Sequence, residues 1–321
     1  MKLFGLNQNW VKCGQCSSEF DFNKNEGCPF CGFGSKSRKV EIQQQVRVDN
    51  TPITKTSYLA VPNGSLRLKP GRVASIERTM SVGSWGMFNS FFPGKAVARI
   101  LARTLEERKT DYVVLDELVD RVSAVFQDTW VSELRGFPNN PQSDSALSRL
   151  VHHFVRTFAE MGLFEVKAKE TTKDDVWNEP WGHILITLTK EGLEFAKLKN
   201  RIFDDHDSTQ VLTDEEIKWL GNYLKRIDKE GYREYSLLKA VYDFIISGHN
   251  GKNDLWEWFS RNRNFVDYVK NHSRKSADEK AFNKQLKNLS TTFASSKIAL
   301  LRELGVIKNK RDDYTIIGGL D

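Results

Sequence analysis

The sequence predicts an α+β multidomain protein in which a small cysteine-containing module and a small β region precede two mainly helical domains. All four cysteines lie within the first 31 residues, in two Cys-x-x-Cys pairs. An amphipathic helix that ends at a glycine and continues into a short apolar strand occurs twice in the rest of the chain. Lys and Arg outnumber Asp and Glu by 17 to 8 in residues 1–110 and by 20 to 16 in residues 211–321, whereas residues 111–210 hold 11 against 18.

The composition excludes several classes of protein. A chain of 321 residues is long enough for two or three domains. The 39% hydrophobic and 28% charged residues are ordinary for a globular protein, which excludes collagen, a disulfide miniprotein and a wholly disordered chain. No apolar run approaches the roughly 20 residues that cross a bilayer, and the N-terminal residues lack the apolar stretch of a signal peptide. We therefore expect a cytoplasmic protein without membrane contact.

The cysteine pairs predict a metal site formed by Cys13, Cys16, Cys28 and Cys31. Two tight turns that each present two thiolates can make a tetrahedral S4 site, which suits Zn²⁺ at a Zn–S distance of about 2.3 Å. Apolar residues around Trp10 and Phe20 indicate two short strands. The pattern resembles a zinc ribbon, and the Cys-Pro-Phe-Cys-Gly sequence resembles a rubredoxin-type knuckle. Residues 1–37 are thus expected to hold a structural zinc ion, because four cysteines leave no position for substrate water; iron is the alternative.

Residues 38–93 are expected to form a small β region and a linker. Residues 38–48 alternate as a strand does, and the Val-Pro-Asn-Gly sequence at 61–64 predicts a hairpin turn. Residues 80–94 are rich in Gly, Ser and aromatic residues, and we interpret them as an irregular plug under a helix rather than a docking segment. Ala96 follows Gly94-Lys95 where a phosphate-binding loop requires Ser or Thr, so this chemistry is excluded.

Two helical domains are predicted from the repeated pattern. The first has expected helices at 95–108, 115–126 and 145–161, strands at 163–169 and 183–188, and a closing helix capped by Thr189. The second has expected helices at 214–229, 235–246, 277–289 and 292–304, a helical insertion at 254–271, and strands at 305–308 and 314–317. Gly162 and Gly305 suit the left-handed position after a helix. This order resembles a winged helix, which implies domains at 94–202 (acidic) and 211–321 (basic).

The second domain carries the predicted DNA contacts. Residues 261–311 hold 13 Lys and Arg against 4 acidic residues, and residues 289–307 resemble a winged-helix recognition helix with its turn. Basic side chains can bind phosphates, and serines on such a helix can reach base edges. The expected contacts are Lys284, Lys287, Ser295, Ser296, Lys297, Arg302, Lys308, Lys310 and Arg311.

The acidic first domain would repel DNA, so we expect it to bind a protein partner or a second copy of the chain. Catalytic motifs such as His-Glu-x-x-His and Gly-x-Ser-x-Gly do not occur, and the Asp-Asp-His-Asp sequence at 204–207 is interpreted as a solvated linker. The sequence therefore predicts a non-enzymatic protein that binds double-stranded DNA. The alternative is a non-catalytic adaptor in a DNA-processing, transcription or phage-defence complex.

Overall fold

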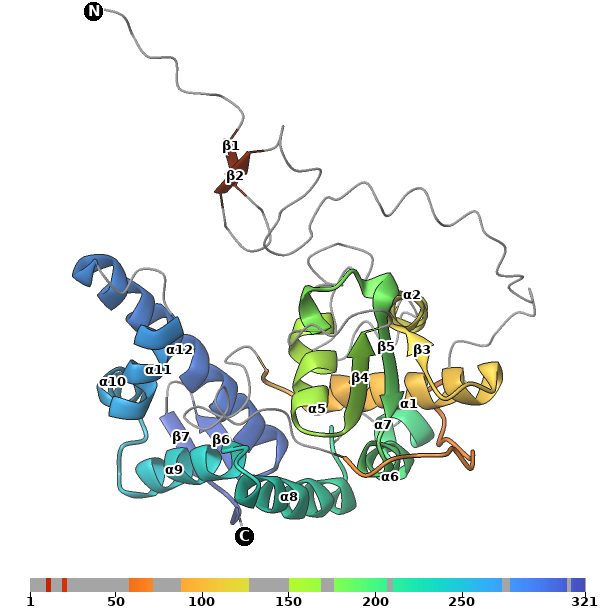
Figure 1. Cartoon of the computed structure of the whole chain (residues 1–321). Helices are drawn as coiled ribbons and strands as arrows, with labels where there is room; N and C mark the ends of the chain where they lie inside the picture. Colours follow the sequence, from red (N-terminus) through yellow and green to blue (C-terminus); the bar gives the residue numbers. More distant parts are fainter. Residues whose placement is uncertain are drawn as a thin grey trace, which may run out of the picture.

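The computed structural model describes residues 10–12, 19–21, 58–71, 88–126, 150–168, 176–206, 210–272, 278–310 and 313–320. These residues form a mixed helical and β structure with small antiparallel sheets, which confirms the predicted α+β class at this level. Figure 1 shows two bodies. We call the described residues between 58 and 206 the first unit and those between 210 and 320 the second unit.

The first unit packs helices against a small sheet. Its elements are α1 (Phe92–Arg108), β3 (Val113–Val114), α2 (Leu115–Phe126), a π-helical turn (Leu150–Val155), α5 (Arg156–Glu160), β4 (Phe164–Ala168), β5 (Ile184–Leu188), α6 (Lys190–Lys197) and α7 (Arg201–Asp205). Two 3₁₀ turns, Val176–Asn178 and Trp181–His183, precede β5. The described strands form one antiparallel sheet in the order β3-β5-β4, with Phe164 opposite Leu188.

The residues before α1 fill the core of the first unit. Phe88, Phe91 and Phe92 are each no more than 1% exposed. The ring of Phe88 lies 5.2 Å from that of Phe91 and 6.1 Å from that of Phe158, both in edge-on contact. This agrees with the predicted plug for residues 88–91, whereas residues 92–94 form the first turn of α1.

Local signals placed the ends of several elements correctly. Gly162 has φ of 80° and Gly305 has φ of 69°, so both occupy the left-handed conformation expected after a helix. The hydroxyl of Thr189 accepts a hydrogen bond from the Gly192 amide at 3.1 Å, which confirms the predicted cap of α6. A Cβ atom on Gly192 would lie 2.0 Å from the carbonyl oxygen of Leu163, so this helix packs too closely for a side chain there.

The second unit is mostly helical. Its elements are α8 (Asp214–Lys229), α9 (Glu234–Ile246), α10 (Lys252–Arg261), α11 (Arg263–His272), α12 (Glu279–Glu303), β6 (Ile307–Lys310) and β7 (Asp313–Ile316). Strands β6 and β7 form a hairpin in which Ile307 lies opposite Ile316. A capping box between Thr213 and Glu216 begins α8.

The predicted turn near residues 290–291 is wrong, because α12 is one continuous helix of 25 residues. The turn was expected from the resemblance of residues 289–307 to a winged-helix recognition helix. Residues 290–292 are Ser-Thr-Thr, and such side chains often bond to backbone groups outside helices. Here each hydroxyl instead donates to the carbonyl oxygen four residues earlier, at 2.8 to 3.0 Å. These bonds satisfy the hydroxyls inside the helix, so the helix continues through them.

The predicted hairpin at residues 61–64 is also wrong. Residues 58–71 contain no strand pair of their own, and cross the first unit as a single segment. The carbonyl oxygen of Val61 accepts from Arg103 of α1 at 2.6 Å, and that of Lys69 accepts from the Lys190 amide at 2.9 Å. Partners in α1 and α6 thus take the hydrogen bonds that a hairpin would have used. The strand expected at 38–48 lies outside the described residues.

At the N-terminus, β1 (Trp10–Lys12) pairs with β2 (Glu19–Asp21), and Trp10 lies opposite Asp21. The two strands agree with those expected around Trp10 and Phe20. All four cysteines lie outside the described residues, so the zinc site stays a prediction.

Candidate nucleic-acid interface

Helix α12 separates a buried face from an exposed one. Phe293, Ala294, Ile298 and Leu301 are buried in the core of the second unit. Residues of an α-helix follow one another at about 100° around the axis, so Lys284, Ser295 and Arg302 lie within about 20° of a common line. All three are exposed, as is Lys287 about 60° from that line. Figure 1 shows α12 running along the second unit. We call Lys284, Lys287, Ser295 and Arg302 the basic face of α12.

The structure exposes five of the nine predicted DNA contacts. Four form the basic face of α12, and Lys308 is exposed on β6. Lys310 ends β6, but its side chain lies outside the described residues. Arg311 lies outside them altogether.

The prediction that Ser296 and Lys297 contact DNA is wrong. Lys297 is fully buried, and its Nζ atom lies 2.7 Å from Oε1 of Glu234, which is also fully buried. Ser296 is 3% exposed. Lys297 follows Ser295 by two residues, or about 200° around the helix, and therefore faces the core. Burial lowers the pKa of Lys297, while the carboxylate of Glu234 opposes that shift.

Helical periodicity could have identified this error from the sequence. Lys297 falls four residues after Phe293 and four before Leu301, on the apolar stripe that enters the core. A single lysine in such a stripe indicates a buried partner of opposite charge. No local pattern identifies Glu234 as this partner, because 63 residues separate the two.

The cations of the basic face of α12 differ from two arginines of the neighbouring helices. Arg261 of α10 pairs with Glu257 at 3.1 Å, and Arg263 of α11 approaches Asp267 at 3.8 Å. In contrast, Lys284, Lys287 and Arg302 have no carboxylate of another described residue within ion-pair distance. Exposed lysines also occur on α8 and α11, so α12 holds a part of the positive charge that is available to a phosphate.

A buried arginine of the first unit pairs with a carboxylate of the same unit. Arg99 of α1 is fully buried, and its guanidinium group donates to the carboxylate of Asp204 at 2.7 and 2.9 Å. Asp204 also accepts from the Asn200 amide at 2.7 Å, and these bonds lower its pKa although burial opposes the shift. The prediction of a solvated linker at 204–207 is therefore wrong for Asp204, since a buried arginine requires an anionic partner.

A third buried ion pair, unlike the other two, joins the two units. Lys95 of α1 contacts Glu216 of α8, and both side chains are fully buried. Nζ of Lys95 also donates to the carbonyl oxygen of Leu198 at 2.7 Å, and Asn200 donates to Glu216 at 2.9 Å. Burial lowers the pKa of Lys95 to about 8, against the attraction of Glu216. Lys95 therefore has a structural role in the contact between α1 and α8.

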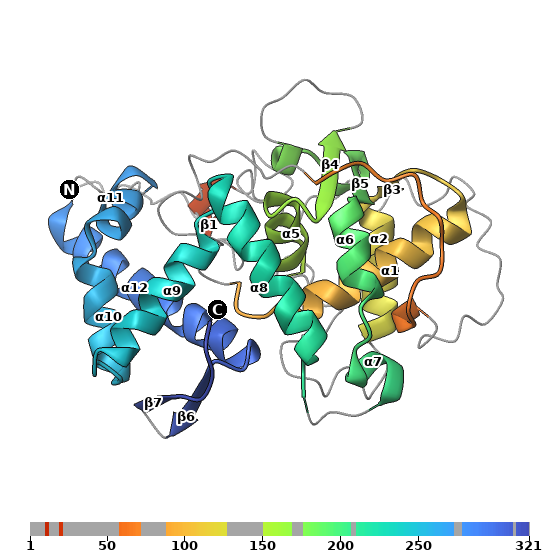
Figure 2. The same cartoon turned by 90° about the horizontal axis from the view of Figure 1, so that it is seen from below.

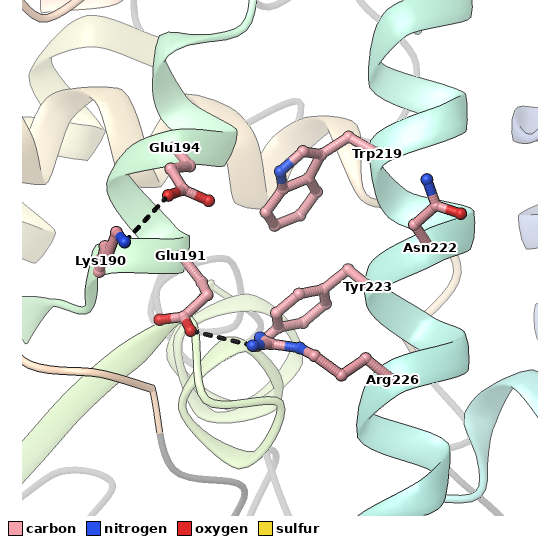
Figure 3. Close-up of a pocket in the computed structure, with 7 residues that line it drawn as sticks. All are labelled: Lys190, Glu191, Glu194, Trp219, Asn222, Tyr223 and Arg226. Carbon is pink, nitrogen blue, oxygen red and sulfur yellow. Dashed lines mark hydrogen bonds and ion pairs between the residues drawn. The ribbon is translucent and has the colours of Figure 1, made fainter.

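A groove of about 310 Å³ lies between α6 and α8, and Figure 3 shows its lining side chains. They are Lys190, Glu191, Glu194, Trp219, Asn222, Tyr223 and Arg226. Arg226 pairs with Glu191 at 3.2 Å, and Lys190 approaches Glu194 at 3.9 Å. The two carboxylates thus offset the two cations, which leaves the groove without the net charge that would attract an ionic ligand.

The groove belongs to the contact between the units. Tyr223 of α8 donates its hydroxyl to the carbonyl oxygen of Met161 at 2.5 Å. Its ring stacks on Trp219 at 4.9 Å, and Trp219 stacks on Phe195 of α6 at 5.2 Å. These rings bury apolar surface between α6 and α8. We therefore place the candidate interface on α12 rather than in the groove.

Comparisons of the chain with protein-family models, with curated proteins and with solved structures found no match. In the part of the chain that the structure describes, no group of three or more His, Cys, Asp or Glu residues could hold a metal ion. Within the same residues, every helix is too short or too polar to cross a membrane.

Proposed function

We propose that the chain binds double-stranded DNA through the basic face of α12 and the β6–β7 hairpin. The observation that carries the proposal is a row of exposed cations without carboxylate partners among the described residues. Lys284 and Arg302 are separated by about 27 Å along the helix axis, with the uncharged Ser295 between them. Such a row can bind phosphates at its two ends, while the serine lies where a base edge would be.

The order of the elements supports a winged-helix class for both units. In the first unit, α1, β3, α2 and α5 precede the β4–β5 pair, and β5 lies between β3 and β4. In the second unit, α12 leads directly into the β6–β7 hairpin. A helix followed by a hairpin can place basic residues on both sides of a DNA groove. Lys308 of β6 supplies the exposed charge on the hairpin side.

We propose a different role for the first domain, residues 94–202. Residues 94–202 hold 16 Lys and Arg against 17 Asp and Glu, so the domain has no excess of positive charge for DNA. Its basic side chains Lys95 and Arg99 are buried in ion pairs with Glu216 and Asp204. A protein partner or a second copy of the chain fits this charge better. If the DNA proposal fails, this domain makes the chain a non-catalytic adaptor that acts through protein contacts.

Charge reversal tests the DNA proposal. We expect the variant Lys284→Glu/Lys287→Glu to bind a random duplex at least about tenfold more weakly than the wild type at about 0.1 M salt. The control Lys218→Glu/Lys229→Glu reverses two exposed lysines of α8 and changes the net charge by the same amount. Fluorescence anisotropy at several salt concentrations measures both affinities and the salt dependence of each.

Two results would contradict the proposal. Equal weakening in both variants would mean that net charge, rather than the basic face of α12, determines binding. Absence of wild-type binding at low salt would exclude DNA as the ligand and would leave the adaptor function.

The salt dependence gives a further expected result. Loss of two phosphate contacts in Lys284→Glu/Lys287→Glu should reduce the slope of log affinity against log salt by about 2.

We also propose that residues 1–37 form a zinc ribbon with a structural Zn²⁺ ion. The β1–β2 hairpin supports this, because Cys13 and Cys16 lie in the connection between its strands. Native mass spectrometry is expected to find a zinc ion on each chain and to lose it in Cys13→Ser/Cys28→Ser. The variant Ser17→Ala, in the same connection, should retain the metal. Iron, or a chain without metal, would contradict this assignment.

A further inference from the structure

Helix α1 does not supply its own N-terminal cap. Phe91 occupies the N-cap position, and its side chain accepts no hydrogen bond from the helix amides. The first turn contains a proline and no acidic residue. The first amide groups of an α-helix have no acceptor within the helix, and a buried helix end must find acceptors elsewhere. Phe91 and Phe92 are buried, so water cannot readily serve.

The acceptor comes from the other unit. Glu303, the last residue of α12, places its carboxylate against the start of α1. Its Oε2 atom accepts from the Phe91 amide at 2.7 Å, and its Oε1 atom accepts from the Phe92 amide at 2.9 Å. Oε1 also accepts from the hydroxyl of Ser90 at 2.7 Å. A carboxylate 211 residues further along the chain thus performs the task of an N-cap side chain.

This contact lies next to the basic face of α12. Arg302 is exposed, whereas the following residue, Glu303, is turned toward α1. The last turn of α12 therefore joins the proposed binding surface to the first unit.

We propose that Glu303 is a latch between the two units, which holds the C-terminal end of α12 against the N-terminus of α1. A second attachment lies one turn further along α1, where Lys95 contacts Glu216 of α8. Figure 2 shows α8 between α6 of the first unit and α9 of the second. Release of the latch would leave the α8 contact in place, so the end of α12 would move away from α1 without separation of the units.

Hydrogen exchange of the full-length chain tests the latch. We expect Glu303→Ala to raise amide exchange about tenfold in the first turn of α1 and in the last turn of α12, because the acceptor of the Phe91 and Phe92 amides is removed. Exchange in α10 should stay unchanged. The control Glu279→Ala removes an exposed glutamate from the opposite end of the same helix and should leave α1 as it is.

Two milder variants keep the test decisive if Glu303→Ala does not fold. Glu303→Gln retains an acceptor oxygen but places an amide donor near a backbone donor, so its exchange should rise by an intermediate amount. Ser90→Ala removes a hydroxyl donor and should raise exchange about twofold to threefold in the first turn of α1. Unchanged exchange at α1 in these folded variants would overturn the proposal. The readout needs no nucleic acid, so it is independent of the DNA experiment.

Discussion

Replacement of Lys297 by alanine is expected to lower the free energy of unfolding by about 3–5 kcal/mol. The substitution leaves the carboxylate of Glu234 fully buried without its cation, at a position where the Nζ to Oε1 distance is now 2.7 Å. An isolated buried charge costs far more than an exposed one, because no water can solvate it. Urea denaturation at constant pH measures the change.

Two controls separate the buried pair from the general loss of a lysine. Lys284→Ala removes an exposed lysine from the same helix and should change stability by no more than about 0.5 kcal/mol. Lys297→Met/Glu234→Gln removes both charges and should recover most of the loss. A Lys297→Ala variant as stable as Lys284→Ala would show that the side chain is not buried. Weaker DNA binding by a Lys297 variant would report unfolding rather than a lost contact.

Replacement of Glu216 by alanine is expected to cost a similar amount, about 3–5 kcal/mol, and to weaken the contact between the units. Glu216 is the buried anion opposite Lys95, and it accepts from Asn200 at 2.9 Å and from the Thr213 amide at 2.7 Å. Its loss leaves Lys95 buried without this carboxylate and also removes the capping box of α8. Thermal unfolding should show a lower midpoint for the variant.

The neighbouring residue provides a matched control. Glu215→Ala removes an exposed glutamate from the same first turn of α8, and we expect a loss of no more than about 1 kcal/mol from the helix dipole. Glu216→Gln retains an acceptor for Asn200 and Thr213, so the double variant Lys95→Met/Glu216→Gln should be more stable than Glu216→Ala. Equal midpoints for Glu215→Ala and Glu216→Ala would contradict the role of the buried pair.

Much of the helical framework could be predicted because its signals are local. Helices α2 and α8 have the bounds expected from apolar periodicity and caps. The strands that follow Gly162 and Gly305 begin close to the expected positions. Each of these elements has the type, helix or strand, that the sequence predicts. The cysteine pattern remains a prediction, since its residues lie outside the described part of the chain.

The candidate site was predicted only in part. Lys284, Lys287, Ser295, Arg302 and Lys308 are exposed as a DNA contact must be. Lys297 lies four residues from both Phe293 and Leu301, so the apolar stripe of the helix expected at 292–304 already places Lys297 on the buried face. A continuous helical wheel from Glu279 to Glu303 would have placed it correctly.

By itself the sequence determined where most helices begin and end, which glycines follow them and where positive charge accumulates. These features depend on backbone conformation and hydrogen bonds within a few residues, so a short stretch of chain contains the whole signal. Only the tertiary structure decided that Lys95, Arg99 and Lys297 are buried cations and that Glu303 caps α1. Their partners lie 63 to 213 residues away along the chain. A buried charge is stable only next to such a partner, because burial removes the water that would solvate it. Packing of the complete chain brings the partners together.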